Sequence, residues 1–197
     1  MNLISNILYW ISTGLLVPVI VLLIYFFIRA LILIGAFFSQ YMIERKTAVL
    51  LQEKITNAHP TQILENIEAL PDSGTALINK YLKDVASAKG NEARMQLIVS
   101  EYEMAAEKNI AGSKILTKMG PILGLMGTLI PMGPALVGLA TGDIASMAYN
   151  MQVAFATTVV GLVVSAIGFV TQQARERWAT RNLVVLDYVV QSLSEAK

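Results

Sequence analysis

The chain has 197 residues, of which 55% are hydrophobic and 15% charged, with a formal net charge of +1. It contains no cysteine, which excludes disulfides, thiolate nucleophiles and cysteine-ligated metals. The near-neutral charge argues against a nucleic-acid-binding surface, and the mean hydropathy of +0.57 indicates an integral membrane protein.

The first apolar stretch has two parts. Residues 1–13 place apolar side chains at helical spacing around Tyr9 and Trp10, which suits a helix in the outer interface or an extension of the next segment. Residues 14–38 are the predicted transmembrane helix 1. Its single charge, Arg29, is expected to face a subunit interface or anionic headgroups. Without a basic leader, the run is expected to be a retained anchor rather than a signal peptide.

Residues 39–118 are predicted to form a helical domain on the cytoplasmic side. Apolar residues recur there at helical spacing, and no strand-like alternation is found. Asn91 is expected to cap a long helix that continues to Pro121, so that the second span projects from the membrane as one rod. The only histidine, His59, has no second ligand near it, and no metal site is predicted.

Two further apolar runs, residues 119–139 and 149–171, are each long enough to cross a bilayer as a helix, and neither contains a charged residue or histidine. Residues 140–148 connect them on the outer side, with a short turn expected at Thr141-Gly142-Asp143, and residues 172–197 continue as a cytoplasmic C-terminal helix. Small residues at helical spacing mark contact faces between helices in lipid, because close backbone approach holds such helices together. The predicted packing residues are Gly120, Gly124, Gly127, Gly161 and Ser165.

The placement of the basic residues predicts the orientation. Of the 15 Lys and Arg residues, ten lie between Tyr41 and Lys118, four follow Gln172, and the last is Arg29. Because basic loops stay on the cytoplasmic side, the N-terminus is expected outside and the C-terminus inside, with three spans between them.

Two motifs occur in the apolar runs: Gly120-Pro121-Ile-Leu-Gly-Leu-Met-Gly-Thr128, and then Ala154-Phe-Ala-Thr-Thr158-Val-Val-Gly161-Leu162. In this order, and with this layout of spans, the chain resembles the MotA/TolQ/ExbB proton-channel family. The resemblance implies a ring of five copies in the cell (inner or plasma) membrane around two copies of a MotB/TolR/ExbD-like partner. That partner has a single span with an aspartate, and ion flow turns the ring relative to it.

The resemblance also implies roles for single residues. Thr128 and Thr158 match the family's threonines on the second and third spans, and Pro121 matches a proline near the cytoplasmic end of the second. The sequence departs from the family at Val153, where TolQ- and ExbB-type members have a glutamate, and at Pro131 and Pro134 of the second span, where those members have no proline. It is therefore expected to be an outlying branch, neither a typical flagellar stator nor a typical energiser of outer-membrane transport.

The two later spans offer hydroxyls but no carboxylate of their own. Thr128, Thr158 and the neighbouring Thr157 either line a polar path for ions or only pack helices. Pro131 and Pro134 each leave a backbone carbonyl without its helical hydrogen bond, and that either kinks the helix or adds to an ion lining.

From these observations we expect an all-α integral membrane protein with three transmembrane helices, forming a homo-oligomeric ring that is driven by an ion gradient. The transported ion is H⁺ or Na⁺, and no cofactor, bound metal or catalytic constellation is predicted. Two alternatives stay open: a membrane scaffold ring that does not conduct, and a small ion transporter that acts alone.

Overall fold

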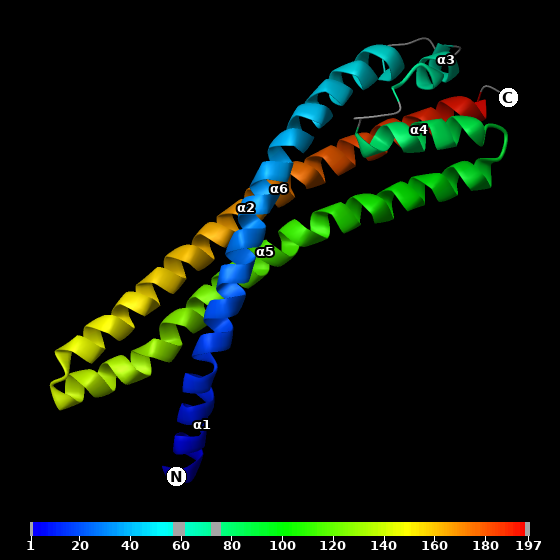
Figure 1. The fold of residues 1–197 in the computed structure, drawn as a ribbon. Coiled ribbons are helices and arrows are strands. Elements are labelled where there is room, and N and C mark those ends of the chain that lie inside the picture. The colour runs from blue at the N-terminus through cyan, green and yellow to red at the C-terminus, as the bar shows by residue number, and fades with distance from the viewer. Residues whose placement is uncertain (1, 57–61, 72–75, 196–197) are drawn as a thin grey trace. The chain divides into compact units, whose positions relative to one another are not determined.

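The computed structural model describes residues 2–56, 62–71 and 76–195, and every regular element among them is helical (Figure 1). The elements are α1 (Asn2–Gly14), α2 (Leu16–Leu51), the π-helix η1 (Gln52–Thr56), α3 (Ile63–Glu68), α4 (Leu77–Ser87), α5 (Glu92–Thr141) and α6 (Ile144–Glu195). The predicted all-α fold is confirmed. His59 lies outside the described residues.

Three stretches of helix are long and apolar enough to cross a membrane: Ile7–Ile55, Glu92–Thr141 and Ile144–Glu195. At 1.5 Å per residue, a helix of some 50 residues is about 75 Å long, far more than the ~30 Å of a hydrocarbon core. Only part of each helix can therefore lie in lipid, and the uncharged runs at 119–139 and 149–171 are the parts that fit. The protein is a membrane protein with three candidate spans.

The N-terminal segment continues almost directly into the first span. Only Leu15 separates α1 from α2. The nitrogen of Leu15 still bonds to the carbonyl of Ile11, and that of Val19 to the carbonyl of Leu15, at 3.1 Å each. Of the two interpretations of residues 1–13, this continuity favours the extension of the span.

The chain divides into two compact units. The span unit comprises Met1–Ile34 and Gly112–Gln172, and the head unit comprises Gly35–Ala111 and Gln173–Lys197. Helices α2, α5 and α6 each contribute residues to both units.

The described residues of the head unit share one hydrophobic core. It gathers fully buried aliphatic side chains from α3, α4 and α6, together with the end of α2 and the start of α5. Tyr81 and Tyr102 meet edge-to-face in this core with ring centroids 5.4 Å apart. Gly90, with φ of +91°, follows α4, and the Oδ1 of Asn91 accepts a hydrogen bond of 3.1 Å from the nitrogen of Arg94. Asn91 therefore caps α5 as predicted.

In the span unit, α5 continues as a helix through Pro121, Pro131 and Pro134. The turn to α6 is shorter than the predicted residues 140–148, because residues 144–148 are already helical. It consists of Gly142, with φ of +76°, and Asp143, whose carboxylate accepts a 3.0 Å hydrogen bond from the nitrogen of Ser146. Glycine suits that left-handed backbone, and the aspartate caps α6.

Candidate functional site

Helices α5 and α6 meet in the span unit along a line of glycines, which we call the glycine seam (Gly120, Gly124 and Gly127 on α5, and Gly161 on α6). A methyl group added at Gly120 would lie 2.6 Å from the carbonyl oxygen of Gly161, and one added at Gly161 would lie 2.6 Å from that of Gly120. Only glycine permits this backbone contact. The predicted packing residues thus join two helices of the same chain.

Hydroxyl groups border the seam and satisfy backbone carbonyls. Ser165 on α6 donates a 3.0 Å hydrogen bond to the carbonyl of Thr117 on α5. Thr157 faces Gly127 so closely that an added Cβ would lie 2.6 Å from the threonine Oγ1. Thr157 is 7% exposed, and its hydroxyl lies 3.0 Å from the carbonyls of Val153 and Ala154. In the single chain it is therefore a packing residue of the seam.

Helix α2 covers one side of the α5–α6 pair. Val19 and Leu23 of α2 form a buried cluster with Leu123 and Ile130 of α5. Further along, α2 contributes Ala30, with 0% exposure, to a second cluster that also contains residues of α5 and α6: Leu116 and Val164, with Val160 and Ile167 packed against them. One flank of the pair is thus occupied within the chain.

Thr128 and Thr158 lie on the other flank. At 100° per residue, Thr128 is about 140–160° round α5 from Leu123 and Ile130, and Thr158 is about 120–160° round α6 from Val164 and Val160. A Cβ at Gly124 would lie 3.6 Å from the Cα of Thr158, which places this threonine directly beside the seam. Both threonines are half-buried.

We call this flank the uncovered edge (Thr128 and Thr158 with their exposed neighbours Leu125, Met132, Phe155 and Leu162). Each threonine hydroxyl bonds to a carbonyl of its own helix: Thr128 to Leu125 at 2.7 Å and Thr158 to Ala154 at 3.0 Å. The apolar neighbours are 42–65% exposed. The structure therefore brings two of the three predicted threonines to one accessible edge and separates Thr157 from them.

The three prolines of α5 have different surroundings. Pro121 is exposed, Pro131 is buried and Pro134 is half-buried. Pro131 follows Gly127 by one helical turn, so it continues the line of the seam rather than the uncovered edge. Arg29 is exposed on α2, where its guanidinium lies 5.9 Å from the ring centre of Tyr25.

Sequence reasoning missed a buried polar cluster in the head unit. The carboxylate of Glu44, 6% exposed, accepts from Asn182 and Arg181, both at 3.4 Å. Glu44 belongs to the segment predicted to lie outside the membrane. Burial raises the pKa of its carboxyl, and the hydrogen bond from Asn182 and the charge of Arg181 oppose that rise. The signal was in the sequence, since Glu44 falls on the same helical face as Thr47 and Leu51, which are both buried.

A small cavity of about 30 Å³ adjoins this cluster and is lined in part by Glu44, Tyr102 and Asn182. The Oδ1 of Asn182 is buried there without a hydrogen-bond partner. Desolvation also raises the pKa of Tyr102 to about 12. The cavity has room for a water molecule that could satisfy Asn182. Within the described residues, no three His, Asp or Glu side chains gather as a metal site.

Comparison with known proteins identifies a family for this chain. The model of the MotA/TolQ/ExbB proton channel family matches residues 61–185, which is more than half of the chain. The matched region includes both glycine-bearing spans and most of the head unit. A search of curated proteins gives no match.

Proposed function

The chain belongs to the MotA/TolQ/ExbB proton channel family, and from this premise we propose that it is the ring subunit of an ion-driven membrane motor. In this proposal the proton is the transported ion and Na⁺ the alternative. The ring is a pentamer that encloses two copies of a single-span partner carrying a transmembrane aspartate. One observation carries the proposal: Thr128 and Thr158 share the uncovered edge.

The chemistry follows from the lack of a titratable group on the two later spans. A bare charge in hydrocarbon is costly, so an ion crossing there needs polar carriers. Threonine hydroxyls can donate and accept hydrogen bonds, and can replace part of an ion's hydration shell. The partner supplies the carboxylate, and the two threonines solvate the ion or proton beside it. Thr157 and the three prolines support the helix packing around this path.

A ring requires surfaces for contact between copies that are not already buried inside the single chain. The glycine seam joins α5 to α6 within one chain, so it does not serve assembly. The uncovered edge is apolar and accessible, and it suits contact with the partner or with a neighbouring copy. Native mass spectrometry of the purified protein should give a pentamer, and a stable monomer would contradict the proposal.

The proposed orientation, with the N-terminus outside and the C-terminus inside, is supported by the concentration of Lys and Arg in residues 39–118 and 172–197. Ala145 and Ser87 are both exposed and suit labelling. A cysteine at Ala145 should react with an impermeant reagent from outside, and one at Ser87 only after the membrane is opened. Labelling of Ser87 in intact cells would reverse the orientation.

Partner dependence separates the proposal from its two alternatives. The experiment measures H⁺ and Na⁺ uptake into vesicles that hold this chain alone, or this chain with a single-span, aspartate-bearing protein from the same source. The proposal predicts uptake only with both proteins. Uptake by the chain alone would favour a small independent transporter, and assembly with the partner without uptake would favour a scaffold.

A further inference from the structure

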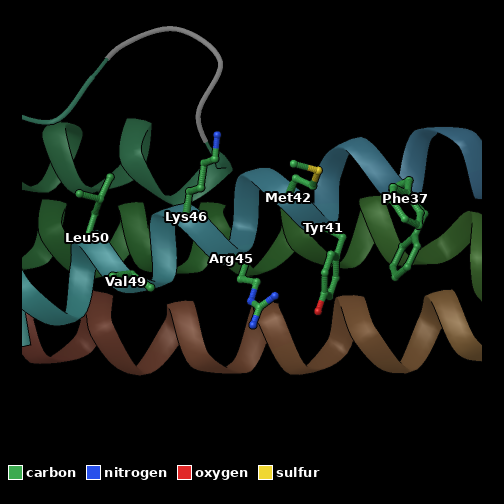
Figure 2. Close-up of a pocket in the computed structure, with 8 residues that line it drawn as sticks. Phe37, Tyr41, Met42, Arg45, Lys46, Val49 and Leu50 are labelled. Carbon is green, nitrogen blue, oxygen red and sulfur yellow. The ribbon is translucent and has the colours of Figure 1, made fainter.

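Helix α2 carries an apolar groove that begins at the predicted end of the first span and continues beyond it. The groove measures about 820 Å³ and is lined by residues between Phe37 and Leu50 (Figure 2). Phe38, Met42 and Val49 are 53–70% exposed along it. Apolar side chains with this exposure need a cover that the described part of the chain does not provide.

Two cations interrupt the same surface. Arg45 and Lys46 line the groove and are exposed. Neither forms a hydrogen bond or ion pair with any described residue. The neighbouring carboxylate of Glu44 cannot serve them, because it is buried and bound to Arg181 and Asn182. Figure 2 shows Tyr41 and Arg45 pointing the same way and Lys46 leaving the helix in another direction.

We propose that this groove is a binding site for an anionic phospholipid. The phosphate lies against Arg45, Lys46 adds positive charge from another side of the helix, and an acyl chain lies along Phe38 and Met42. Arg45 is seven residues, or roughly 10 Å, beyond Phe38, just past a headgroup region about 5–8 Å deep, and its long side chain can reach back into that region. Aromatic and basic side chains are the usual residues at that depth on the cytoplasmic side.

The occupant must be apolar at one end and anionic at the other. Within the groove, Phe38 and Met42 lie one helical turn apart and are 70% and 53% exposed. A second copy of the chain would have to present acidic groups next to an apolar surface. An anionic lipid provides both features in one molecule and is already present in the bilayer.

Trp178 provides a built-in reporter. Its ring stacks on Phe37 with centroids 5.5 Å apart and lies 6.1 Å from Tyr41, and both of these residues line the groove. The chain has two tryptophans, so Trp10→Phe leaves Trp178 as the only one. The Trp10→Phe protein, complete and in detergent micelles, is titrated with phosphatidylglycerol or phosphatidylcholine that carries brominated acyl chains.

Brominated phosphatidylglycerol should quench Trp178 at a mole fraction at least tenfold lower than brominated phosphatidylcholine. Adding Arg45→Gln and Lys46→Gln should abolish this preference. Each cation near an anionic lipid raises the affinity for that lipid about fivefold. The matched control, Arg94→Gln with Lys108→Gln, removes two exposed cations of α5 and should retain it.

Three results would overturn the proposal. Equal quenching by the two lipids would show contact without headgroup recognition. Retained preference in the Arg45→Gln/Lys46→Gln protein would place the anion elsewhere. Absence of quenching, together with disulfide cross-linking between copies through Val49→Cys, would show that a second chain occupies the groove.

Discussion

Helices α5 and α6 run through both units, and each unit holds them in a different way. In the span unit the two backbones touch at Gly120 and Gly161, and hydroxyls such as that of Ser165 bond directly to carbonyls. In the head unit the ends of the same helices bury large side chains, among them Tyr102 and Leu186. We interpret the difference as the result of two solvents, with lipid around the span unit and water around the head unit.

In lipid, apolar side chains gain little from leaving their surroundings, so helices associate through close backbone approach and hydrogen bonds. In water, burying large apolar side chains is the main source of stability, at roughly 25 cal/mol per Å² of apolar surface. The head unit also buries a carboxylate, that of Glu44. The runs 119–139 and 149–171 contain no acidic residue at all. We therefore expect the stability of the span unit to depend on its contact glycines, and that of the head unit to depend on its buried side chains.

The largest effect is expected from alanine at Gly120 and Gly161, the two seam glycines whose backbones touch. Gly120→Ala or Gly161→Ala would force a methyl group to within 2.6 Å of a backbone oxygen. We expect a loss of about 3 kcal/mol or more, because backbone must move to relieve the clash. Thermal unfolding in detergent, followed by circular dichroism, measures this loss.

Two other glycines of α5 provide graded controls. At Gly124 an added Cβ would meet its nearest neighbour at an ordinary 3.5 Å, and at Gly112 it would meet nothing within 4 Å. Gly124→Ala should be mild, and Gly112→Ala should be neutral or slightly stabilising, since alanine favours helix over glycine. If all four substitutions behave alike, the seam is not the contact that holds the span unit together.

A smaller and pH-dependent effect is expected at Glu44 in the head unit. Burial raises the pKa of this carboxyl above its ordinary 4.5, so the folded protein holds the proton more tightly than the unfolded chain. Its contribution to stability is therefore present at low pH and is lost as the pH rises from about the ordinary value through the raised one. Glu44→Gln should make the stability of the protein depend less on pH in this range.

The measurement is the melting temperature between pH 4 and pH 8 for the wild type, Glu44→Gln and a control, Glu103→Gln, which removes an exposed carboxylate of α5. Only Glu44→Gln should reduce the fall in stability toward neutral pH. A wild-type profile that rises with pH, and loses that rise in Glu44→Gln, would mean that the pair with Arg181 outweighs the cost of burial.

Much of the fold could be predicted because periodicity and caps are local signals. The three long helices, the Asn91 cap and the contact-forming glycines follow from residue spacing alone. The short α5–α6 turn was expected at Thr141-Gly142-Asp143, and only its extension to residue 148 was wrong, because residues 144–148 are already helical.

The candidate site was less predictable because it depends on tertiary contacts. Sequence placed Thr157 beside Thr158 but could not tell that Thr157 faces Gly127 in the seam, or that α2 leaves the edge with Thr158 uncovered. Glu44 was overlooked for the same reason. Its partners, Arg181 and Asn182, lie far along the chain on α6.

The smallest expected effect on stability is also the most direct test of function. Thr158→Val and Thr157→Val each replace one hydroxyl with a methyl group at adjacent positions of α6. Ion uptake is measured in vesicles that hold the ring and its single-span partner, with assembly checked by native mass spectrometry. The account predicts that both variants assemble, that Thr158→Val loses most of the partner-dependent uptake, and that Thr157→Val retains most of it. Equal uptake by Thr158→Val and the wild type would contradict the proposed role of the uncovered edge.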